Sequence, residues 1–150
     1  MSASCCTALA DGLLFPCAGG SNVGQIANDA AVKLEQSGVG RLYCLAGIGG
    51  HVEGMVKHAQ SVPCTVAIDG CATGCARKTL EHAGIEPTIH VTVTELGIQK
   101  ELTYEYPEED VQRVVDAVLH GTETAPVVGP AAASCCGTAG TEETPSCCES

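Results

Sequence analysis

The feature that most constrains the fold is a regular alternation of short apolar runs with stretches of helical periodicity, joined at glycines. Single strands are expected at 13–17, 41–46, 64–69 and 89–94, and helices at 22–38, 52–60, 71–83 and 107–120. Residues 101–106 also alternate and predict a fifth strand. Such a chain forms right-handed crossovers. We therefore expect a three-layer α/β fold, with a mainly parallel sheet of four to five strands and helices on both faces.

Composition divides the 150 residues into three parts. We expect residues 1–12 to form a flexible arm and residues 13–120 to form the folded domain. Residues 121–150 form a tail that lacks aromatic and basic residues, and we expect this tail to be disordered. The net charge of −11 argues against nucleic acid or an anionic membrane as partner. The sequence shows no signal-peptide pattern and no bilayer-length apolar run, so we expect a cytoplasmic protein with reduced cysteines and no membrane insertion.

Cysteine is the unusual residue, with 11 copies. Ligands of such sheets bind beyond the carboxyl ends of the strands. The expected strands bring four thiols to that edge, with the last two spaced to share one helix face; these are Cys17, Cys44, Cys71 and Cys75. Four thiolates match a closed tetrahedral zinc site. Cys64 begins its strand at the opposite edge and is excluded.

Other interpretations of these residues remain open. A buried cysteine can be simply a small apolar side chain, and we weigh that equally for Cys44. His51 could replace Cys44 as the fourth ligand. Asp69 could hydrogen-bond to a ligand or cap the following helix, and capping is favoured. Ser21 is the other residue expected to support the ligands.

A glycine-rich turn from Cys17 to Gly24 leads into the first long helix. The N–H groups and dipole at a helix start would hold Cys17 as a thiolate. This gives a competing hypothesis, a thiol enzyme that uses Cys17 for sulfur or redox transfer. An iron–sulfur cluster is a third option, because four cysteines suit it as well.

The sequence around Asp69-Gly70-Cys71 resembles the motif that names the DGC-domain family of putative zinc-binding proteins. The likeness extends over about residues 13–120 through three further blocks, at 17–25, 43–50 and 94–98. The resemblance implies a small prokaryotic protein that binds zinc through Cys17, Cys44, Cys71 and Cys75. It implies no established activity.

Vicinal cysteine pairs stand at both ends of the chain, at Cys5 and Cys6, Cys135 and Cys136, and Cys147 and Cys148. Their arrangement resembles the vicinal pairs of arsenical metallochaperones. Adjacent thiols are good joint ligands for soft ions. We therefore expect a zinc-binding protein that handles metal or metalloid ions. The cysteine pairs of residues 1–12 and of the tail, which we together call the arms, would capture soft ions and pass them to a transporter or acceptor protein. The alternative is that the tail binds metal without a specific function.

Overall fold

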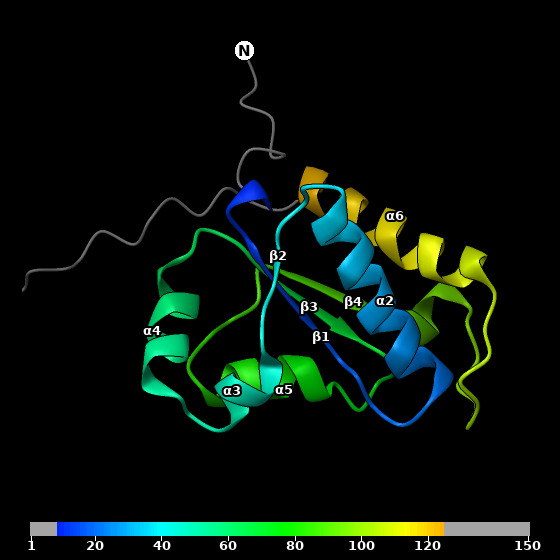
Figure 1. Cartoon of the computed structure of the whole chain (residues 1–150), viewed down its shortest axis with the longest axis horizontal. Helices are drawn as coiled ribbons and strands as arrows, with labels where there is room; N and C mark the ends of the chain where they lie inside the picture. Colours follow the sequence, from blue (N-terminus) through cyan, green and yellow to red (C-terminus); the bar gives the residue numbers. More distant parts are fainter. Residues whose placement is uncertain (1–8, 125–150) are drawn as a thin grey trace, which may run out of the picture.

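The computed structural model describes residues 9–124 and contains one parallel sheet in the strand order β2-β1-β3-β4 (Figure 1). The strands are β1 (Leu13–Pro16), β2 (Arg41–Leu42), β3 (Thr65–Asp69) and β4 (Ile89–Thr92). Every pairing is parallel. Consecutive strands are joined by helices, so all four carboxyl ends lie at the same edge. The predicted α/β class is confirmed.

Helices cover both faces of this sheet. One face carries α2 (Asn22–Gln36) and α6 (Glu108–Thr124), and the other carries α3 (Leu45–Gly49), α4 (Glu53–Ser61) and α5 (Cys75–His82) (Figure 1). A short 3₁₀ turn, η1 (Val93–Leu96), follows β4. The chain therefore has the expected three layers.

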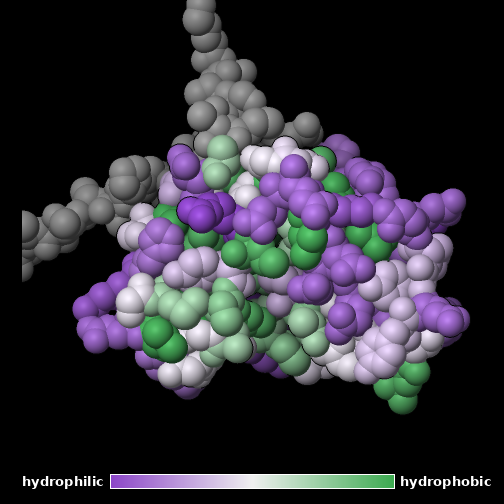
Figure 2. Space-filling view, in the orientation of Figure 1, coloured by the Kyte–Doolittle hydropathy of each residue, from purple (hydrophilic) through white to green (hydrophobic). Residues whose placement is uncertain are grey.

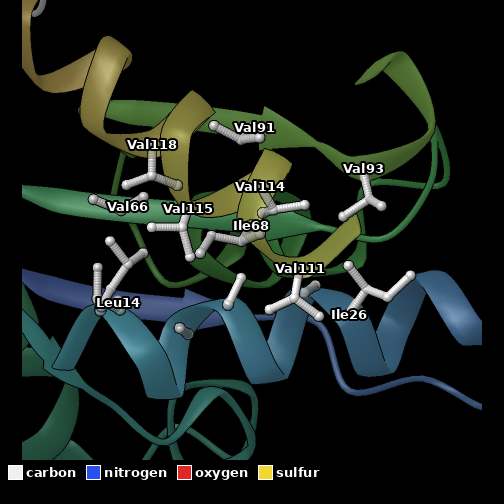
Figure 3. Packing of buried hydrophobic residues seen from close by; sticks show 14 of the residues in the cluster. Leu14, Ile26, Val66, Ile68, Val91, Val93, Val111, Val114, Val115 and Val118 are labelled. Carbon is white, nitrogen blue, oxygen red and sulfur yellow. The ribbon is translucent and has the colours of Figure 1, made fainter. Parts of the chain in front are cut away.

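The central strands are apolar on both sides because both sides are covered. Leu14, Val66 and Ile68 point toward α2 and α6 (Figure 3). Phe15 and Ala67 belong to the second apolar cluster, beneath α3, α4 and α5. Two cores thus hold the ends of β1 and β3 side by side.

The helix predicted after Pro107 is confirmed as α6. Its buried valines follow the helical spacing 111, 114, 115 and 118 and pack on the sheet (Figure 3). The helix continues to Thr124, beyond the expected end at 120. At the other end of the domain Leu9 is buried in the same core.

The strand predicted at 89–94 ends at Thr92, where η1 follows, and three other predicted elements differ more. The strand at 41–46 ends at Leu42, because Cys44 caps α3. The helix predicted from Cys71 begins only at Cys75, after a left-handed Gly74. The fifth strand at 101–106 does not form, since this segment is fixed to the start of α2 instead.

The face of the molecule shown in Figure 2 is mixed in character. Figure 2 shows hydrophilic side chains along the outer side of α6 and a mixed surface elsewhere on that face. Of the helices described, none combines the length and the apolar character that crossing a bilayer requires.

Candidate functional site

The ends of β1 and β3 bring two distant parts of the chain together. Pro16 pairs with Ile68, and the Cys17 amide donates to the Ile68 carbonyl at 2.8 Å. A cavity of about 210 Å³ lies at this edge and is lined by Cys17, Cys71 and Cys75. We call these residues the edge thiols. Three of the four predicted ligands are thus brought to one cavity.

Two glycines allow the turns around the cavity to approach each other. A Cβ on Gly24 would lie 2.7 Å from the backbone N and O of Gly19. A Cβ on Gly70 would lie 2.9 Å from the Gly24 nitrogen and 3.0 Å from the Val23 carbonyl. The turn after β1, the start of α2 and the turn after β3 are therefore in direct backbone contact.

The start of α2 is capped by Ser21, and Asn22 is the first residue of the helix. The Gly24 amide donates to Ser21 Oγ at 3.4 Å. Ser21 also lines the cavity of the edge thiols, but its described hydrogen bond is this cap. Its role in supporting a ligand stays a prediction.

Asn22 fixes the segment that was predicted to be a fifth strand. Its side chain donates to the Gln99 carbonyl at 2.9 Å and accepts from the Glu101 amide at 2.7 Å. The segment is anchored again where the Tyr106 hydroxyl donates to Asp29 at 2.7 Å. Burial and this bond raise the pKa of Tyr106 to about 12.

Lys100 is a site residue that sequence reasoning missed. The segment held by Asn22 places Lys100 at the cavity, with its Nζ 3.6 Å from Cys71 Sγ. Lys100 is 29 residues from Cys71 in an irregular loop. No spacing in the sequence could have indicated this contact.

Asp69 caps α5, as expected. Its carboxylate is 1% exposed and accepts from the amides of Ala76 at 2.7 Å and Arg77 at 3.1 Å. His90 of β4 lies 2.9 Å from the same carboxylate. Asp69 therefore sets where α5 begins. Cys71 falls in the preceding turn and Cys75 in the helix, so the prediction that both project from one helix face was wrong.

The surroundings of Cys71 favour its thiolate. A hydrogen bond between its sulfur and the Thr73 hydroxyl, at 3.4 Å, lowers the pKa of the Cys71 thiol. The Thr73 backbone and Lys100 act in the same direction. A thiolate is the form that binds metals and attacks electrophiles.

Cys44 and His51 lie outside the cavity of the edge thiols. Cys44 is exposed, and its sulfur accepts from the Gly47 amide at 3.4 Å. It lines a separate cavity with Pro16 and Ala18, the two neighbours of Cys17. His51 follows α3 and faces His82.

The edge thiols have the donor chemistry for zinc or a soft ion. Within residues 9–124, however, no three His, Cys, Asp or Glu side chains are arranged to hold a metal ion. Coordination would require the edge thiols to turn toward one another. Cys75 is exposed and the other two are half-buried, so solvent reaches all three.

Cys64 lies at the opposite edge, where β3 begins, and is 6% exposed. Burial raises the pKa of its thiol. Its position agrees with its exclusion from the site. The vicinal cysteine pairs at Cys5 and Cys6 and in the tail lie outside the described residues.

A family model for the DGC domain matches residues 13–118, which include the edge thiols and the Asp69-Gly70-Cys71 turn. The chain belongs to the DGC domain family. It is also 35% identical over 102 residues to the anaerobic and virulence modulator AnvM of Pseudomonas aeruginosa. That match covers 68% of this chain and 78% of AnvM. No solved structure matches the chain.

Proposed function

We propose that this DGC-domain protein binds a thiophilic ion, zinc in the first instance, through the edge thiols Cys17, Cys71 and Cys75. The observation that carries the proposal is the single cavity that these three residues line. Thiolates are the preferred protein ligands of zinc and of softer ions. The fourth ligand of the ion would be Cys44, a cysteine of the arms, or an exchangeable ligand from solution. Cys44 is a candidate because it lines a cavity with Pro16 and Ala18, the neighbours of Cys17.

The charges around the cavity suit a thiolate complex. Three thiolates bound to a divalent ion leave one net negative charge, and Lys100 is placed to balance it. Asp69 and His90 would hold the start of α5, and with it Cys75, in place. The ligands would thus be supported by groups that do not touch the ion.

The arms extend this role to soft ions. The vicinal pairs at Cys135 and Cys136 and at Cys147 and Cys148 can each chelate As(III), Hg(II) or Cu(I). Two pairs on one chain raise the local concentration of the second pair to roughly the millimolar range. A transporter or acceptor protein would then receive the ion.

The test is X-ray absorption at the zinc edge on full-length protein whose six arm cysteines are serine. We expect sulfur to dominate the ligands, at zinc–sulfur distances of about 2.3 Å. Zinc coordinated only by nitrogen and oxygen would contradict the proposal. A brown protein that contains iron would instead indicate the cluster alternative.

A second function, thiol exchange, is favoured by the lowered pKa of Cys71. In that reaction the Cys71 thiolate attacks one sulfur of a partner's disulfide, forms a mixed disulfide and releases the other sulfur as a thiolate. In this second proposal the nucleophile is Cys71, whereas the sequence pointed to Cys17. Fast alkylation of Cys71 in zinc-loaded protein would favour exchange, because a bound thiolate is protected.

A further inference from the structure

Two exposed histidines from different elements face each other away from the edge thiols. His51 lies in the turn between α3 and α4, and His82 is the last residue of α5. Their nitrogens Nε2 and Nδ1 are 3.2 Å apart, and the rings are inclined at 65° rather than stacked. Two imidazole nitrogens are therefore directed at the same small region.

That separation suits two ligands of one metal ion. With metal–nitrogen bonds of about 2.0–2.1 Å and a tetrahedral angle, the two nitrogens lie roughly 3.3 Å apart. In the absence of metal the same distance allows one ring to donate a hydrogen bond to the other. Binding then needs a change of tautomer in the donating ring, whose proton moves to its other nitrogen, and a small turn of the two rings toward the ion.

The backbone supplies a second, independent observation. His51 has a φ of 53°, and it is the one non-glycine residue with positive φ in the part of the chain that the structure describes. Glycine occupies the other five such positions. A histidine side chain at this position costs backbone strain that glycine would avoid. The strain is consistent with a use for the ring itself.

Hydrogen bonds and core packing fix the backbone around the two histidines. The His51 amide donates to the Ile48 carbonyl at 3.0 Å, and the Val52 amide donates to the Gly47 carbonyl at 3.0 Å. These bonds close the turn after α3, and α3 packs against α5 through Ile48 and Leu80 in the shared core. The backbone of the His51 turn is therefore anchored to the same core as α5.

We propose that His51 and His82 form a second, exposed metal site, which binds a borderline divalent cation such as zinc or nickel, with water completing the coordination. Imidazole suits these ions. Both rings are exposed, so an ion can enter and leave without any opening of the fold. The site is distinct from the edge thiols and does not rest on the function proposed for them.

The test follows the histidine ring resonances of full-length, reduced protein by NMR during a zinc titration that continues past saturation of the thiols. We expect the rings of His51 and His82 to change together. His58, which is exposed on α4, serves as the control and should respond only at roughly tenfold higher zinc, because it has no facing imidazole to chelate with.

Two variants make the result decisive. His51→Gly removes one ligand and relieves the positive φ, so the fold should survive with an unlowered melting temperature, and zinc should bind His82 at least roughly tenfold more weakly. His82→Gln should have the same effect on His51. If either partner responds to zinc as before when the other is removed, or if both respond no sooner than His58, the proposal is wrong. Cys71→Ser should leave the histidine response unchanged, which separates this site from the edge thiols.

Discussion

Cysteines at the two edges of the sheet differ in opposite directions in the pKa of their thiols. At the amino edge Cys64 is enclosed by the core, and burial raises the pKa of its thiol. At the carboxyl edge Cys71 lies in an open turn beside Thr73 and Lys100, which lower the pKa of its thiol. The two residues are seven positions apart, on either side of β3. Placement relative to the strand, rather than cysteine content, decides which thiol is available for chemistry.

The carboxyl edge depends most on Asp69. Replacing Asp69 with alanine leaves the amides of Ala76 and Arg77 without their acceptor at the start of α5. We expect a loss of about 2–4 kcal/mol in the free energy of unfolding, measured by urea denaturation. Glu86→Ala, an exposed carboxylate at the amino edge, should change stability by less than about 0.5 kcal/mol. An equal loss of stability in Asp69→Ala and Glu86→Ala would show that the Asp69 cap does not stabilise the start of α5.

Gly70 tests the close backbone contact under the edge thiols. In Gly70→Ala the new Cβ meets the backbone of Val23 and Gly24, so α2 must shift away from β3. We expect a cost of about 1–3 kcal/mol, read from thermal unfolding. Gly54→Ala is the matched control, since that position in α4 opens onto free space and alanine should be neutral or stabilising. A Gly70→Ala protein as stable as wild type would show that the contact is not required.

The difference in pKa between the two thiols has a direct chemical readout. With a limiting dose of iodoacetamide on metal-free protein near neutral pH, Cys71 should be labelled before Cys64, as determined by peptide mass spectrometry. The labelling rate of Cys71 should rise with pH with a midpoint below 9.0, because its pKa lies below that ordinary value. Cys64 should titrate above 9.0. Simultaneous labelling of both would remove the contrast between the edges.

The smallest effect on stability is expected from removing the tail. Because α6 continues to Thr124 and Gly121 lies close to Ile89, the chain should be ended after Thr124 and not after His120. Thermal unfolding and core zinc should be unchanged. Titration of reduced protein with As(III) should show lower capacity, since Cys135, Cys136, Cys147 and Cys148 are lost. The same capacity in both chains would show that the tail takes no part.

The central strands could be predicted from sequence because their composition reflects burial on both faces. The runs at 13–17 and 64–69 needed no information from elsewhere in the chain. The alternating segment at 101–106 misled because two of its large apolar side chains stay exposed instead of packing on the sheet. Leu102 and Tyr104 are 91% and 70% exposed, and the segment is held by Asn22 from 79 residues away.

The sequence was enough to predict at which edge of the sheet the candidate site lies, but not the contacts within the site. The rule that ligands bind at the carboxyl ends of strands placed Cys17, Cys71 and Cys75 together. The start of α5 was misjudged, because Asp69 accepts from an amide inside the helix and also contacts His90 of β4, a neighbour that no local pattern indicates. The Lys100 contact and the pairing of His51 with His82 likewise depend on the fold and on no local pattern.

Zinc bound by Cys71 can be distinguished from zinc bound elsewhere by the zinc content of a matched pair, Cys71→Ser and Cys64→Ser, in protein whose six arm cysteines are serine. Both variants remove one thiol near an end of β3. We expect Cys64→Ser to keep the zinc of the parent protein, and the zinc content of Cys71→Ser to fall well below one ion per chain. Full zinc in Cys71→Ser, or an equal loss in both variants, would contradict this expectation.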